Sequence, residues 1–122
     1  MKNKEKKKIR FLRDPLPIRL AGLAADLARV SSSARHESGD ASVEEMLEES
    51  QYYIEWTAAE ADVEVAGELV DMQRMIALWR RIWSEARPSR TQRTLLSVQA
   101  KKWSDYALEK SGITQLVKGA SG

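Results

Sequence analysis

Apolar side chains recur along most of this chain at alternating steps of four and three residues, which is the spacing of one face of an α-helix. The first stripe is formed by Leu16, Leu20, Leu23, Leu27, Val30 and Ala34. Further stripes run through residues 46–57, 69–83 and 95–110, and no stretch alternates with the period of two expected of a strand. The pattern therefore predicts an all-α fold, and we expect a four-helix up-and-down bundle or a close variant.

The expected helix starts are marked by residues that can cap backbone amides. Asp14 is suited to cap the first helix, with Pro15 as its opening residue. Ser42 and Glu45 have the spacing of a capping box, and an acidic first turn follows that suits the helix dipole. These signals predict one helix that begins at residue 15 and a second that begins near residue 42.

The remaining boundaries follow from length, proline and glycine. An uninterrupted helix from Ser42 to Ala86 would be much longer than is typical, so we expect a turn or a sharp kink within Thr57–Val65. Pro88 ends the preceding helix, and Ser89 then offers a cap for the last one. Gly112 stands where a left-handed residue closes a helix.

The distribution of charge divides the chain into a central domain and two tails. Residues 1–13 carry seven Lys or Arg and one Glu without a regular apolar period, which predicts a flexible, disordered basic tail. Residues 14–113 form the expected bundle domain, and residues 114–122 are expected to fray. Within the domain, residues 37–71 contain twelve acidic residues and no Lys or Arg, whereas residues 74–102 contain eight basic residues and one Glu. We expect the acidic segment to pack beside the basic one.

The residue types that carry most enzyme chemistry are scarce. The chain has no Cys, and its one histidine, His36, falls in an expected loop between charged neighbours. A single His cannot supply the paired Glu-x-x-His ligands of a di-metal bundle, and the six glycines are too scattered for a phosphate-binding loop. We therefore predict no catalytic, metal or cofactor site, and a protein that is not an enzyme.

The hydropathy of the chain bears on its location. No apolar run is long enough to span a bilayer, and the basic N-terminal stretch lacks the apolar core of a signal peptide. We expect a cytoplasmic protein without membrane insertion.

Large aromatic side chains are the candidates for a partner surface. Tyr52 and Tyr53 are adjacent in a predicted helix and point about 100° apart, so both cannot face one core. We expect an interface with a protein partner, or with a second copy of the chain in a homo-oligomer, at Tyr52, Trp56, Trp79 and Trp83. The alternative is that Trp79 and Trp83, which lie on an apolar stripe, belong to the core, and that Tyr52 is half-exposed near a helix boundary.

A group of arginines around Pro88 suggests a second kind of function. The group, a candidate for anion contact, consists of Arg80, Arg81, Arg87, Arg90 and Arg93. Together with the basic tail, it could bind the phosphates of a nucleic acid. We expect a non-enzymatic protein-interaction or scaffold module first, and an accessory nucleic-acid-binding protein as the alternative.

Several short segments combine aromatic and charged residues in a recognisable way. They are Tyr53-Ile-Glu-Trp-Thr57, Leu69-Val-Asp-Met-Gln73, Trp79, Arg81-Ile-Trp83, Trp103-Ser104 and Leu108-Glu-Lys-Ser-Gly112. In these segments the chain resembles a group of small helical proteins of cyanobacteria, over residues 14–113. The resemblance implies a cytoplasmic, cyanobacterial setting, and because that group has no assigned activity, it supplies no functional residues.

Overall fold

A computed structural model describes residues 3–113 of the chain, and over these residues the regular secondary structure is entirely helical. The elements are α1 (Lys4–Arg13), α2 (Leu16–Ser33), the short 3-10 helix η1 (Glu37–Gly39), α3 (Asp40–Ala58), α4 (Val63–Ala86) and α5 (Arg90–Ser111). The prediction of an all-α fold is confirmed. The predicted fraying of residues 114–122 lies outside the described residues.

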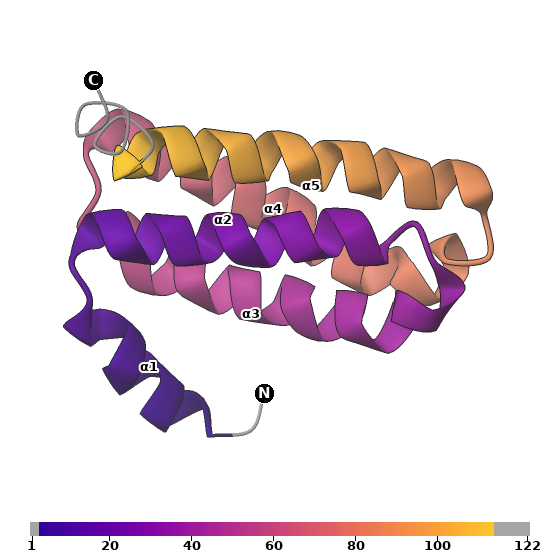
Figure 1. The fold of residues 1–122 in the computed structure, drawn as a ribbon, viewed down its shortest axis with the longest axis horizontal. Coiled ribbons are helices and arrows are strands. Elements are labelled where there is room, and N and C mark those ends of the chain that lie inside the picture. Colours follow the sequence, from indigo (N-terminus) through magenta and orange to yellow (C-terminus); the bar gives the residue numbers. More distant parts are fainter. Residues whose placement is uncertain (1–2, 114–122) are drawn as a thin grey trace.

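The four long helices α2 to α5 lie side by side and alternate in direction along the chain (Figure 1). Helix α2 packs against both α3 and α5, and α3 packs in turn against α4. The contact between α4 and α5 is much sparser than these three. Helix α1 lies outside the group and is joined to α2 by a short turn (Figure 1).

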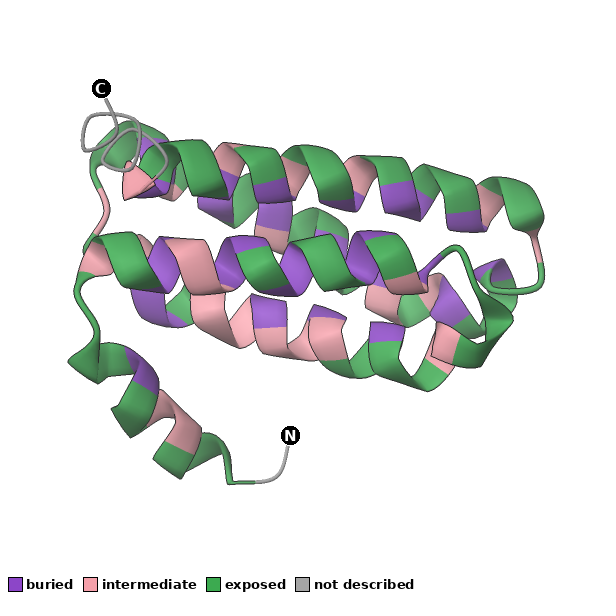
Figure 2. Ribbon diagram, in the orientation of Figure 1, coloured by how far each residue is buried: buried purple, intermediate pink, exposed green. Residues whose placement is uncertain are grey.

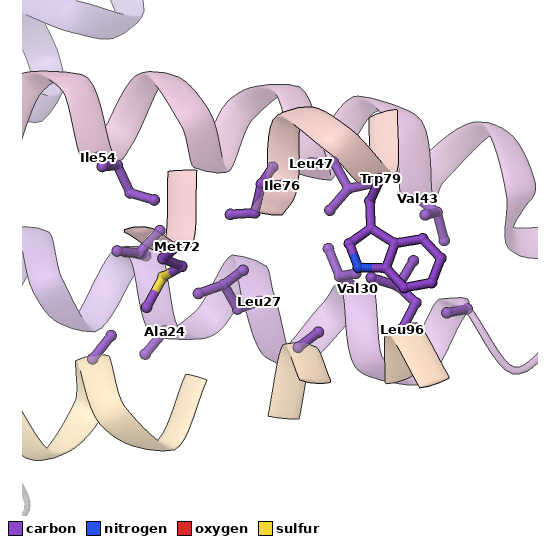
Figure 3. Close-up of a cluster of buried hydrophobic side chains, with 14 of the residues drawn as sticks. Ala24, Leu27, Val30, Val43, Leu47, Ile54, Met72, Ile76, Trp79 and Leu96 are labelled. Carbon is purple, nitrogen blue, oxygen red and sulfur yellow. The ribbon is translucent and has the colours of Figure 1, made fainter. Parts of the chain in front are cut away.

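The core lies between the long helices and is built from the predicted stripes. From the first stripe, Leu20, Leu23, Leu27, Val30 and Ala34 are buried, and Leu16 packs at the edge of the core. Figure 3 shows side chains from α2, α3 and α4 meeting in the interior, including Leu27, Leu47, Ile76 and Trp79. Buried residues line the inward sides of the helices, while α1 is exposed along most of its length (Figure 2).

The break between α3 and α4 falls where the sequence predicts it. Helix α3 ends at Ala58, and α4 begins at Val63 with the Asp62 side chain accepting a hydrogen bond from the Val65 backbone amide at 3.0 Å. Such a cap satisfies an amide that has no partner inside the helix. Two separate helices, rather than one long helix, therefore span this part of the chain.

The last helix has the predicted start and end. The Ser89 hydroxyl accepts a hydrogen bond from the Gln92 amide at 3.2 Å, which confirms the cap after Pro88. Gly112 closes α5 with a φ of 73°, a left-handed conformation that glycine adopts at little cost.

Two predicted caps are absent. Asp14 follows α1 and makes no side-chain cap for α2, which begins after Pro15. Helix α3 begins at Asp40, because η1 runs directly into it, and Ser42 consequently lies inside the first turn. Both predictions were wrong because each rested on a local pattern, whereas the helix starts depend on the preceding segment.

The N-terminal segment also differs from expectation. Residues 1–13 were predicted to form a disordered tail, but Lys4–Arg13 form α1. The Phe11 ring stacks on the ring of Tyr53 with centroids 4.2 Å apart and planes 6° from parallel, and the Lys7 ammonium pairs with Glu49. Both partners belong to α3, so the helix is held by contacts that are distant in sequence.

Candidate functional site

The aromatic residues of α3 lie beneath α1. The Trp56 side chain is buried, and the Phe11 ring centroid lies 5.8 Å from its ring centroid. Tyr52 is half-buried and stacks on Trp56, and the Lys4 ammonium lies 4.4 Å from the Tyr52 ring centroid. The two predicted interface residues on α3 are thus occupied by a segment of the same chain.

The two predicted interface residues on α4 belong to the core. Trp79 and Trp83 are both buried, and each indole N–H is satisfied inside the chain. Trp79 donates to the Gln99 side-chain oxygen at 2.7 Å, and Trp83 donates to the Asp40 carbonyl oxygen at 3.2 Å. Packing against the other helices removes both residues from the molecular surface, so of the two interpretations of these tryptophans the core one holds.

The predicted arginine cluster does not form a single cationic surface. Arg93 is buried: its guanidinium donates to the Asp40 carboxylate and to the carbonyl oxygens of Ala34 and Arg87, and it lies 5.5 Å from the Trp83 ring centroid. Its charge is therefore neutralised within the fold.

Of the other four arginines, two lie near acidic side chains and two are exposed without an acidic partner among the described residues. Arg87 also approaches Asp40, at 3.6 Å, and Arg80 approaches Glu48 at 3.6 Å and donates to the Gln51 side chain at 2.6 Å. Arg81 and Arg90 are exposed and make no ion pair with the residues that the structure describes. These pairs confirm that the acidic segment packs beside the basic one.

A pair of carboxyl groups lies between α2 and α3, near the docked α1. Asp26 is buried, and its Oδ1 accepts a hydrogen bond from Arg29. Its Oδ2 has no donor among the described residues, although the Glu49 carboxyl lies within hydrogen-bonding reach of the Asp26 carboxyl. Two carboxylates repel each other, so this contact requires a proton on one of them.

The surroundings assign that proton to Asp26. Burial, together with the hydrogen bond and the charge of Glu49, raises the pKa of Asp26 from 3.8 to about 7. Burial acts upward on Glu49 too, but hydrogen bonds from Asp26, Lys7 and Tyr53 outweigh it and hold the pKa of Glu49 below its ordinary value. The pair could not be predicted from the sequence, because Asp26 falls off the apolar stripe of its helix.

An exposed apolar surface spans α4 and α5. We call Met75 and Leu78 of α4, together with Leu95 and Val98 of α5, the α4–α5 patch; Leu95 is 52% and Leu78 46% exposed. The hydrogen bond between Trp79 and Gln99 ties α4 to α5, and Leu78 and Val98 are the sequence neighbours of its two ends.

Two hollows continue this surface. Met75 lines one of about 200 Å³ with Trp103 of α5, where the polar side chains at its edge are Glu68, Asp71 and Lys102. Leu95 and Val98 line a larger one of about 520 Å³ along α5, together with Arg90, Thr91 and Thr94. Sequence reasoning missed the patch, although a signal was present: Leu95 and Leu96 are adjacent on a helix, so both cannot face the core.

Within residues 3–113, no three or more His, Cys, Asp or Glu side chains gather in a way that could hold a metal ion. None of the helices formed by these residues has the length and apolar character to cross a membrane. Comparisons of the chain with protein-family models, with curated proteins and with solved structures find no match.

Proposed function

We propose that this chain is a non-enzymatic, cytoplasmic protein-interaction module, and that it self-associates through the α4–α5 patch. The observation that carries the proposal is the exposure of four large apolar side chains on α4 and α5, whose mutual contact is much sparser than the contacts of α2 with α3 and α5 and of α3 with α4. Exposed large apolar side chains that gather on one part of a surface are characteristic of interaction sites. The alternating directions of α2 to α5 support classifying residues 16–111 as a four-helix up-and-down bundle, whose outer helix pair would form the interface.

The polar edge of the patch suits a second copy of the chain. Glu68, Asp71 and Lys102 lie together at one end, so opposite charges are present on the same surface. In a dimer with two-fold symmetry each surface meets itself, and a surface that carries both signs can pair with its own copy.

The nucleic-acid alternative has weaker support. Three of the five arginines, Arg80, Arg87 and Arg93, are already engaged by acidic side chains of the same chain. Phe11, Trp56, Trp79 and Trp83 are buried, and Tyr53 stacks against α1, whereas base stacking needs exposed rings.

Substitution of Leu95 by Glu tests the proposal. The charge would be placed at the centre of the interface, where it would lose its hydration, so we expect Leu95→Glu to convert a self-associating protein into a monomer. The matched control is Leu108→Glu, because Leu108 is 38% exposed on the same helix but about 140° around its axis from Leu95. Sedimentation velocity over a concentration series measures the change.

The sedimentation results for the parent chain and the two variants distinguish the possibilities. Association of the parent chain and of Leu108→Glu, with loss of association in Leu95→Glu, would support the proposal. A parent chain that stays monomeric at every concentration would refute self-association, and equal loss in both variants would move the interface away from the patch.

A further inference from the structure

The outer face of α1 carries apolar side chains that the protein leaves uncovered. Phe11 points inward onto α3, whereas Ile9 is 55% and Leu12 41% exposed. On a helix, Ile9 lies about 160° and Leu12 about 100° around the axis from Phe11, so both belong to the side turned away from α3. Helix α1 thus has an anchored inner face and an apolar stripe outside.

A third exposed apolar side chain lies near α1, at the start of α2. Ile18 is 46% exposed and lies one helical turn before Gly22. A Cβ atom at Gly22 would lie 3.9 Å from the Phe11 ring, so this side of α2 borders α1. Residues one turn apart share a helix face, which places Ile18 beside α1 at the turn between the two helices.

Basic side chains surround the three apolar ones. Helix α1 contains six Lys or Arg and one acidic residue, Glu5. Lys7 is paired with Glu49 and Lys4 lies over Tyr52. The remaining four cations make no ion pair with any residue between 3 and 113: Lys6, Lys8, Arg10 and Arg13.

We propose that the outer face of α1, with Ile18 of α2, binds the surface of an anionic phospholipid bilayer. Ile9, Leu12 and Ile18 would enter the boundary between headgroups and acyl chains, and the four free cations would lie at the level of the lipid phosphates. An interfacial helix lies in this plane with apolar residues on one side and Lys or Arg beside them. The helix lies on the surface and does not cross the bilayer.

Charge and apolar area are both needed for this binding. Each Lys or Arg near an anionic membrane surface adds a favourable electrostatic attraction, which weakens with salt. A nucleic acid would use the cations but offers no apolar layer in which to bury Ile9 and Leu12, and the aromatic ring of α1 is turned inward. A bilayer is the occupant that matches both properties. The contacts to α3 hold α1 in helical form beforehand, which lowers the ordering cost of binding.

Vesicle co-sedimentation of the full chain provides the test. Phosphatidylcholine vesicles and vesicles that also contain phosphatidylserine are compared at low and high salt, using the parent chain and Ile9→Ser/Leu12→Ser. The control is Val63→Ser/Leu108→Ser, which removes two exposed apolar side chains from α4 and α5. Circular dichroism establishes that each variant retains its helical content.

We expect the parent chain and the control to bind phosphatidylserine-containing vesicles, with little binding to phosphatidylcholine alone and weaker binding at high salt. The α1 variant should lose at least about tenfold in partition coefficient, because two buried apolar side chains are removed. The proposal is overturned if the parent chain does not bind, if it binds both vesicle types equally, or if the α1 variant binds as well as the parent. Tighter binding to a short RNA duplex than to the vesicles would also overturn it and would favour nucleic acid as the occupant.

Discussion

The buried carboxyl pair makes the stability of this protein depend on pH in an unusual direction. The pKa of Asp26 is raised from 3.8 to about 7, so between these values the folded chain holds a proton that the unfolded chain has released. The free energy of unfolding must therefore fall as the pH rises through this interval. The full interval corresponds to at most about 4 kcal/mol, and the part between about pH 5 and about pH 7 to about 3 kcal/mol.

Glu49 acts in the opposite direction at lower pH. The pKa of Glu49 is lower in the folded chain than its ordinary value. The ionised Glu49 therefore adds to the free energy of unfolding above that ordinary pKa, and this stabilisation is lost as the pH falls through the lowered pKa. The two carboxyl groups together predict maximum stability in mildly acidic solution. Above pH 7 the ionised Asp26 keeps only the Arg29 guanidinium as a favourable partner, against the charge of Glu49.

Substitution of Asp26 by Asn isolates this effect. An amide has the shape of the protonated carboxyl, does not ionise, and can donate to Glu49 where the proton did. We expect Asp26→Asn to match the parent chain near pH 5 and to exceed its stability above pH 7 by up to about 3 kcal/mol. Urea denaturation followed by circular dichroism at a series of pH values measures the difference.

The matched control is Asp105→Asn, which alters an exposed carboxylate paired with Lys101 one turn away on α5. It should follow the pH profile of the parent chain within about 0.5 kcal/mol. A parent chain whose stability is constant or increases between about pH 5 and about pH 7 would refute the shared-proton argument. So would an Asp26→Asn variant whose profile runs parallel to that of the parent.

Three further predictions concern other parts of the fold. Arg93→Ala should cost about 3–5 kcal/mol in urea denaturation, because it removes a buried guanidinium and leaves its carboxylate partner without it; a cost below about 1 kcal/mol would show that the pair is dispensable. Phe11→Ala should abolish hydrogen-exchange protection in Lys4–Arg13 while α2 to α5 stay protected, and a general loss of protection would mean that α1 is part of the core. Gly112→Ala should lower the free energy of unfolding by about 1 kcal/mol, because a φ of 73° is strained for alanine; thermal denaturation with no shift would contradict this.

The sequence predicted the features that depend on local periodicity. The stripe from Leu20 to Ala34 and the closing turn at Gly112 both follow from helix geometry within one segment, and both are present. The break within Thr57–Val65 was also predictable, because helix length and weak local propensity act together there.

The features that the sequence did not predict depend on contacts between distant segments. Helix α1 is stable because Phe11 meets Tyr53, 42 positions further along the chain. Asp26 falls off the core stripe of its helix, yet it is buried where α2 packs against α3. In the sequence, Arg93 groups with the other arginines around Pro88. Its burial could not be predicted because its partner, Asp40, lies in another helix.

At the candidate site, too, the sequence identified residue types but did not show which of them packing would leave exposed. The sequence predicted a partner interface at large aromatic residues, but Trp79 and Trp83 belong to the core. The apolar side chains that remain outside, such as Leu95, are ordinary aliphatic residues whose exposure is decided only when the helices pack.

The most direct test of the proposed function is a map of the association surface in solution. Amide correlation spectra of the isotope-labelled chain, recorded over about a hundredfold dilution, report which backbone groups change their surroundings when copies associate. We predict that the concentration-dependent shifts cluster in residues 75–82 and 91–103, around the α4–α5 patch, and spare α1 and α2. Spectra that do not depend on concentration, or shifts that centre on α1 and α3, would contradict the account.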